Sequence, residues 1–197
     1  MSERIHLTKV LQKYLPEEKA IVAYVADLLS VYPLHFKIVK PRKTKLGDFR
    51  WNNLDGKSQI TVNGDLNPYS FLITTVHEIA HFFTFERHGR FVKPHGKEWQ
   101  RIFAELLQNI PQQEQLPNDI RIALQNYSDK PKASSCTDIK LYRVLSRYDK
   151  PEEGHARLEH LTIGTDFELN QHPYKIISKA RTRYLCISLQ TQKKYKV

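Results

Sequence analysis

The sequence predicts an α+β fold, in which helices with a small antiparallel sheet are followed by a small all-β module. Three observations predict it: apolar residues recur at helical spacing in several segments of the first 127 residues, short strand-like stretches lie between residues 35 and 62, and further short stretches fill residues 141–189. The length of 197 residues suffices for one well-packed domain and a smaller appendage.

The composition is that of an ordinary globular chain. Hydrophobic residues make up 40% and charged residues 26% of the sequence, which excludes a disordered protein. No apolar run approaches the roughly 20 residues of a membrane helix, and the N-terminus lacks the apolar core of a signal peptide. We therefore expect the protein in the cytoplasm. Two cysteines, Cys136 and Cys186, can build neither a disulfide framework nor a CxxC-type zinc site.

The first elements are a helix and three strands. Apolar residues at helical spacing predict a helix over residues 17–32, with Pro16 near its start. After Pro33 the pattern changes to short stretches at residues 35–40, 46–51 and 58–62, separated by turn-rich clusters. The simplest interpretation is three antiparallel strands.

Two long helices follow. Asn67 before Pro68 fits an N-cap with proline at the first helical position, and this helix runs to about Arg87, with Gly89 as its terminator. Its apolar residues form two neighbouring stripes, so we expect it to be largely buried. The next helix starts near Pro94 and presents one apolar side formed by Trp99, Ile102, Phe103, Leu106 and Ile110.

The polar, proline-containing segment 129–137 marks a linker after a short helix over residues 119–127. We therefore expect a first domain over residues 1–128 and a small basic β-module over residues 138–197. Within the module, strands are predicted at residues 141–148, 156–163, 166–170, 174–178 and 183–189.

The buried helix carries the motif His77-Glu78-Ile79-Ala80-His81. Residues four apart lie on the same face of a helix, so His77 and His81 can bind one Zn²⁺ ion, with Glu78 beside it. In such a site the metal activates a water molecule and a carboxylate that is not a ligand takes its proton, which is the role we assign to Glu78. The alternative is a structural cluster without metal, although buried histidines and a buried glutamate are costly without partners.

The third metal ligand has several candidates. Thr84 and Arg87 occupy the positions where a metzincin has glycine and histidine, which excludes that class. His88 lies eleven residues from His77, about 16 Å along a continuous helix, and is too far away. The carboxylates Glu98 and Glu105 on the next helix and His95 at its start remain. We favour His95, which follows a short connection in the segment Pro94-His95-Gly96-Lys97-Glu98-Trp99.

The HExxH helix, a connection of about a dozen residues and the segment His-Gly-x-Glu-Trp together resemble the SprT-like family, which includes the Spartan proteases. The resemblance covers residues 17–107, and the segment Lys45-Leu46-Gly47-Asp48-Phe49-Arg50 is similar to part of the family's N-terminal sheet. It implies a zincin-like metalloprotease core with one zinc ion on His77, His81 and His95, and a catalytic Glu78. Many members end in a cysteine-based zinc ribbon, which this chain cannot build.

The resemblance also implies a substrate associated with DNA, because Spartan-type enzymes degrade proteins crosslinked to DNA. The net charge of +10 fits a polyanionic partner, and basic residues gather in two groups with tyrosines interleaved in the second. The first group contains Lys37, Lys40, Arg42, Lys43 and Lys45; the second contains Lys175, Lys179, Arg181, Arg183, Lys193, Lys194 and Lys196, with Tyr174, Tyr184 and Tyr195.

The leading hypothesis is therefore an SprT-like zinc endopeptidase that uses metal-activated water, with a protein or peptide substrate and DNA as a further partner. The rival hypothesis is a nucleic-acid-binding protein in which the zincin core is structural. No residue of the sequence can be singled out as the group that stabilises the oxyanion. The sequence also does not identify the substrate-binding strand or the oligomeric state.

Overall fold

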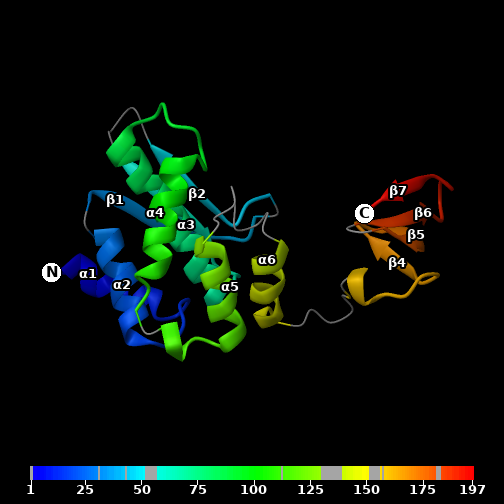
Figure 1. Ribbon diagram of the computed structural model, residues 1–197, viewed down its shortest axis with the longest axis horizontal. Helices are drawn as coiled ribbons and strands as arrows, with labels where there is room; N and C mark the ends of the chain where they lie inside the picture. The colour runs from blue at the N-terminus through cyan, green and yellow to red at the C-terminus, as the bar shows by residue number, and fades with distance from the viewer. Residues whose placement is uncertain are drawn as a thin grey trace. The chain divides into compact units, whose positions relative to one another are not determined.

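A computed structural model describes residues 2–30, 32–42, 44–51, 57–111, 113–129, 139–150, 156, 158–180 and 183–197 (Figure 1). The chain divides into two compact units, Met1–Lys150 and Pro151–Val197. Lys43, Cys136 and Arg181, together with nearly all of the predicted linker 129–137, lie outside the described residues. Among the helices that are described, none is long and apolar enough to cross a membrane.

The first unit contains a three-stranded sheet. Its strands are β1 (Leu34–Val39), β2 (Gly47–Trp51) and β3 (Ser58–Asn63), close to the predicted positions. The order is β1-β3-β2, in which β2 pairs antiparallel with β3 but β1 pairs parallel with it. The expectation of a purely antiparallel sheet was therefore wrong. Because β3 inserts between β1 and β2, the strand adjacent in sequence to β1 is not its partner, and β2 is left as an edge strand.

Helices cover this sheet. The helices α1 (Ser2–Leu11) and α2 (Lys19–Ser30) precede the sheet, and α3 (Pro68–His88), α4 (Lys97–Gln108) and α5 (Asn118–Asp129) follow it, with the short 3₁₀ helix η1 (Gln113–Gln115) before α5. The helix α3 contacts β2 and β3 on one side and α4 on another, and α5 packs on α4 (Figure 1). The α1 helix was not predicted. The 21-residue α3 is thus the central element of the unit.

The start of α3 is held as the sequence predicts. Asn67 is the N-cap, and its side-chain oxygen accepts hydrogen bonds from the backbone N–H groups of Tyr69 and Ser70 at 3.1 and 3.0 Å. Its side-chain nitrogen donates to the carbonyl oxygen of Leu145 at 3.0 Å and to Asp149 Oδ1 at 2.6 Å. One buried amide therefore begins the central helix and ties it to a segment almost 80 residues later in the chain.

That later segment is helical, and the predicted strand over residues 141–148 was wrong. The helix α6 (Ile139–Leu145) and the 3₁₀ helix η2 (Ser146–Tyr148) occupy it, and Leu141 and Leu145 are buried one turn apart. Tyr148 donates a hydrogen bond to Asp119 Oδ1 at 2.6 Å, and its ring packs edge-on against Tyr69. The segment thus belongs to the first unit, which ends at Lys150 and not at residue 128.

We predict that Asn67→Ala lowers the free energy of unfolding by about 2 kcal/mol, because it removes a helix cap and leaves the Leu145 carbonyl without this donor. Urea denaturation of the full chain measures the change. The matched control is Asn126→Ala, an exposed position within α5, which we expect to change stability by less than about 0.5 kcal/mol. Equal effects of the two substitutions would contradict the assigned role of Asn67.

The second unit contains a four-stranded antiparallel sheet in the order β4-β5-β6-β7. The strands are β4 (Asp166–Leu169), β5 (His172–Lys179), β6 (Tyr184–Ser188) and β7 (Lys194–Lys196), and the 3₁₀ helix η3 (Leu158–His160) precedes them. Three of these strands match predicted ones, and β7 was not predicted. The strand predicted over residues 156–163 was wrong, because the described part of that segment contains η3 and a turn.

One face of this sheet carries Lys175, Lys194 and Lys196, whereas the other carries the tyrosines together with Lys179. Cross-strand pairs place Lys175 with Ile187 and Lys194, whereas Tyr174 pairs with Ser188 and Tyr195 pairs with Cys186. Since directly paired residues share a face, the tyrosines lie on the face that carries the buried Cys186. Lys179 lies on that face too, because it pairs with Tyr184, while Lys175, Lys194 and Lys196 lie on the opposite face. The interleaved sequence had suggested one mixed surface, but Lys175, Lys194 and Lys196 do not share a face with Tyr174 and Tyr195.

Candidate metal centre

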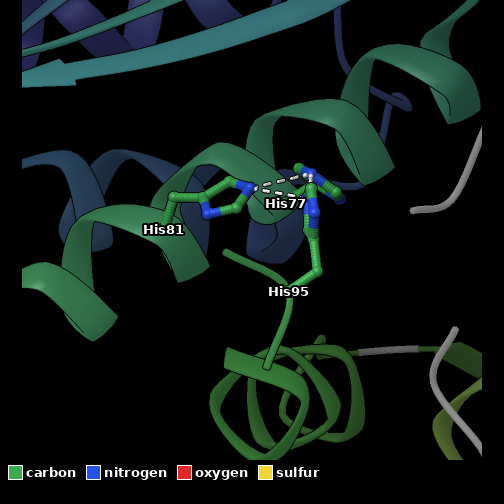
Figure 2. Close-up of side chains that lie close together, drawn as sticks. All are labelled: His77, His81 and His95. Carbon is green, nitrogen blue, oxygen red and sulfur yellow. Dashed lines mark hydrogen bonds between the residues drawn. The ribbon is translucent and has the colours of Figure 1, made fainter. Parts of the chain in front are cut away.

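Three histidine side chains converge beside α3. His77 and His81 project from successive turns of the helix, and His95 reaches them from the segment just before α4 (Figure 2). Their Nε2 atoms lie 3.2 Å (His77 to His81), 2.9 Å (His81 to His95) and 3.2 Å (His77 to His95) apart. This group can hold a metal ion.

Hydrogen bonding alone cannot account for the three contacts. A neutral imidazole nitrogen is either a donor or an acceptor, so among three mutually adjacent Nε2 atoms at least one pair is mismatched. A shared cation removes the mismatch, because all three nitrogens then act as lone-pair donors to it. The chemistry of the donor set therefore fits a metal ion.

All three imidazoles are held in the neutral form that metal binding requires. Burial and the neighbouring imidazoles lower the pKa of His77 to about 2. The same two causes lower the pKa of His81 to about 4, and burial lowers the pKa of His95 below its ordinary value. At neutral pH a metal ion would therefore not have to displace protons from these rings.

The backbone and one aromatic ring fix the positions of the imidazoles. His95 has a φ of 58°, in the left-handed region that non-glycine residues seldom adopt, and α4 begins two residues after it. Trp99, on the first turn of α4, is fully buried, and its ring centroid lies 4.7 Å from His77, 5.3 Å from His81 and 4.7 Å from His95. Trp99 is thus a common platform for the three rings.

Glu78 is buried against the edge strand β2. The backbone N–H of Phe49 donates a hydrogen bond to its carboxyl group. A Cβ atom added to Gly47 would lie 2.6 Å from Glu78 Oε1 and 2.8 Å from Thr74 Cγ2, so only glycine leaves room for both side chains. The strand therefore holds the glutamate in place from the side opposite the helix.

The surroundings of Glu78 favour its protonated form. Burial, followed by the negative charge of Asp48, raises the pKa of Glu78 to about 8, while Arg42, the Phe49 hydrogen bond and Lys45 oppose the shift. Asp48 is itself paired with Lys45 and Arg50. A carboxyl group whose pKa lies near neutrality is suited to both accepting and returning a proton.

The histidines and Glu78 line one open cleft of about 510 Å³. The wall opposite α3 is formed by β2 and the segment before it, including Lys45 of the first basic group, and Pro94 flanks His95 at one end. Because β2 is an edge strand, its free side faces this cleft.

Comparisons with known proteins agree with this geometry. Residues 30–121, which include all four residues of the centre, match the SprT-like family. Residues 30–121 are an SprT-like domain. A 43-residue stretch is 46% identical to Protein SprT of Actinobacillus succinogenes, covering 21% of this chain and 25% of that protein. The chain thus aligns with about a quarter of the length of this relative. No solved structure matches the chain.

The other candidates for the third ligand, Glu98, Glu105 and His88, lie outside the centre. Glu98 is exposed, and Glu105 is exposed with a carboxylate oxygen 4.0 Å from the guanidinium of Arg87. His88 is exposed at the last position of α3. The structure thus brings His77, His81 and His95 together and leaves the other three apart, while their roles as ligands stay a prediction.

Gly47, Phe49 and Trp99 surround the centre, although no role there was predicted for them. The segment with Gly47 and Phe49 was noted as part of a sheet, and Trp99 as part of an apolar helix face. A glycine in a strand pattern often marks the close approach of another group, and this signal pointed to Gly47. That Glu78 and Thr74 approach Gly47 could be known only from the packing of β2 on α3.

We predict that Gly47→Ala lowers kcat/KM for the peptide cleavage proposed below by about 10- to 100-fold, because the added methyl group displaces the Glu78 carboxyl. Metal affinity should not change, since the atoms nearest to the added methyl group belong to Glu78 and Thr74 and not to the three histidines. Steady-state kinetics and a metal-binding titration measure the two quantities. The control is Gly64→Ala, whose new Cβ would meet Ile38 at 2.9 Å, away from the cleft. Unchanged activity of Gly47→Ala would show that β2 does not position Glu78.

Proposed function

We propose that this protein is a zincin-type, zinc-dependent endopeptidase, in which His77, His81 and His95 hold the metal and Glu78 is the general base and acid. The observation that carries the proposal is the convergence of three neutral imidazoles beside a buried glutamate whose pKa lies near 8. The match of residues 30–121 to the SprT-like family supports the same proposal.

Zinc suits the three nitrogens better than harder cations, which prefer oxygen ligands. A tetrahedral zinc site with bonds of 2.0–2.1 Å separates its nitrogens by about 3.3 Å. The separations of 2.9–3.2 Å in the structure are close to this value. When bound, zinc supplies Lewis acidity, which polarises the peptide carbonyl and lowers the pKa of a water molecule.

Glu78 moves the proton. Its carboxylate accepts a proton from the attacking water as the water oxygen bonds to the carbonyl carbon, and it then donates that proton to the nitrogen as the C–N bond breaks. The products are a new carboxylate and a new ammonium group, because the second proton of the water also passes to the amine. Gly47 and Phe49 hold the carboxyl group in place through the cycle, and Trp99 keeps the three imidazoles in register.

The free edge of β2 provides the place for an extended substrate. Asp48 faces Thr61 across the ladder and the Leu46 carbonyl accepts from the N–H of Asn63, whereas the Phe49 N–H points away to Glu78. By the alternation of an antiparallel ladder, Gly47 and Phe49 therefore direct backbone groups toward the cleft. A peptide pairing with this edge would be held by its own backbone, which favours low sequence selectivity.

Digestion of an unfolded protein tests the proposal. The full chain, loaded with Zn²⁺, is incubated with reduced and denatured casein, and fragments are identified by mass spectrometry. We expect cleavage that a chelator abolishes and that added Zn²⁺ restores. Cleavage that is indifferent to the chelator, or no cleavage by the zinc-loaded chain, would contradict the proposal.

The lysine face of the second unit favours a second proposal, that the chain also binds a polyanion such as DNA. Lys194 and Lys196 are exposed on this face, although Lys175 is partly neutralised by Asp166 at 3.3 Å. Cleavage of a DNA-binding protein with and without single-stranded DNA tests whether such binding acts on the protease. DNA binding by a chain without protease activity would instead support the rival hypothesis of a structural zincin core.

A further inference from the structure

A second cavity adjoins the cleft on the side of the α3 N-terminus. Its volume is about 130 Å³, and it shares two lining residues, Leu46 and Thr74, with the cleft. Thr74 lies one helical turn before Glu78, and the site of Gly47 is close to both side chains. The cavity therefore opens beside the glutamate and not beside the histidine at the other end of the motif.

Its lining is mainly apolar. Leu46, Leu66 and Ile73 line it, and α6 adds Leu145 and the exposed Tyr142 as a further wall. Asp149 also lines the cavity, but its carboxylate accepts a hydrogen bond of 2.6 Å from the Asn67 amide. The described surroundings thus favour an uncharged, apolar occupant, because an unpaired charge there would lose its hydration.

The wall formed by α6 and η2 is a property of this chain and lies beyond residues 30–121, the part that matches the family. Asn67 holds Leu145 and Asp149, and Tyr148 is fixed by Asp119 and Tyr69. These contacts attach the wall firmly to the start of α3. The cavity is therefore built into the fold of the first unit.

We infer that this cavity binds the side chain of the substrate residue that follows the scissile bond, and that it selects a medium-sized apolar residue. The inference rests on the proposed protease function. Since Glu78 returns its proton to the leaving nitrogen, the residue that owns this nitrogen lies on the Glu78 side of the centre. The side chain of this substrate residue then faces Thr74. Thr74 lies four residues before Glu78, about 6 Å toward the N-terminus of α3 at 1.5 Å per residue.

The volume sets the size of the preferred side chain. An apolar cavity of about 150 Å³ accommodates a benzene molecule. The 130 Å³ available here suits leucine, isoleucine, methionine or, more tightly, phenylalanine. Because each methylene group in an apolar pocket changes kcat/KM by roughly 10-fold or more, we expect leucine to be favoured over alanine by at least about 10-fold.

A cleavage profile tests the inference. A library of peptides from a digested proteome is cleaved by the zinc-loaded full chain, with Glu78→Gln as the blank, and the residues around each cut are read by mass spectrometry. We expect leucine, isoleucine and methionine to be enriched after the scissile bond. Tyr142→Ala, which opens the wall, should shift the enrichment to phenylalanine and tryptophan, and Leu66→Phe should shift it to alanine. The control is Ile122→Ala, an exposed apolar position in α5 that does not line the cavity.

Three outcomes would overturn the pocket and leave the protease function standing. Residues could be enriched only before the scissile bond, basic residues could be enriched after it, or the profile could stay unchanged in Tyr142→Ala. A binding measurement makes the test independent of turnover. The peptides acetyl-Ala-Ala-Leu-Ala-Ala-amide and acetyl-penta-alanine-amide are titrated into the zinc-loaded Glu78→Gln chain, and the methyl NMR signals of Ile73 and Leu145 are followed. Shifts specific to the leucine peptide that Leu66→Phe abolishes support the pocket, and equal or absent shifts overturn it.

Discussion

Glu78→Gln is expected to lower kcat/KM for peptide cleavage by about 10²- to 10⁴-fold, the usual contribution of a general acid–base group. Glutamine fills nearly the same space against Gly47 and Phe49 but cannot accept and return the proton. Because Glu78 is not one of the three converging residues, zinc affinity should be retained. Cleavage of casein and a zinc titration on the same preparation measure the two properties.

The matched control is Glu86→Gln, an exposed glutamate two turns later on α3. It makes the same replacement on the same helix without touching the cleft, and we expect wild-type activity. If Glu78→Gln cleaves casein as fast as the wild type, the buried glutamate is not the general base and the protease proposal fails.

His95→Ala is expected to weaken zinc binding by more than about 100-fold, since loss of a direct ligand should exceed the 10- to 100-fold cost of losing an outer-shell partner. Zinc should then no longer raise the thermal unfolding temperature, because ligand stabilisation depends on the ratio of zinc concentration to Kd. Competition with a chelator and thermal unfolding with and without Zn²⁺ measure these effects.

His88→Ala controls for the loss of an imidazole in the same region of sequence. His88 lies exposed at the end of α3, outside the three-histidine group, and its removal should leave zinc affinity unchanged. Retained affinity in His95→Ala, or an equal loss in both variants, would show that the third ligand is not His95.

The local elements of this fold were readable because their causes are local. Asn67, Pro68 and Gly89 mark the ends of α3 through capping chemistry that involves only neighbouring residues. The spacing of His77 and His81 places them on one face of any helix. In contrast, α6 was interpreted as a strand, because a short segment rich in leucine, valine and tyrosine fits either period.

The sheet and the second unit show where reading the sequence fails. The sequence around β1 does not indicate that β3 inserts between β1 and β2. Strand order depends on which faces of the sheet are buried by helices elsewhere in the chain. Likewise, lysines and tyrosines that alternate in the C-terminal sequence look like one mixed surface. The pairing of the strands puts Lys175, Lys194 and Lys196 on the face opposite the tyrosines and leaves Lys179 beside Tyr184.

The sequence by itself determined the HExxH helix, the candidate base Glu78 and the choice of His95 over His88, because helical geometry and chain distance suffice for these. Only the tertiary structure decided what surrounds Glu78: the Phe49 N–H and Gly47 on one side and, next to it, a cavity closed by α6. These features join segments up to about 100 residues apart, and such contacts arise from packing that no local pattern encodes.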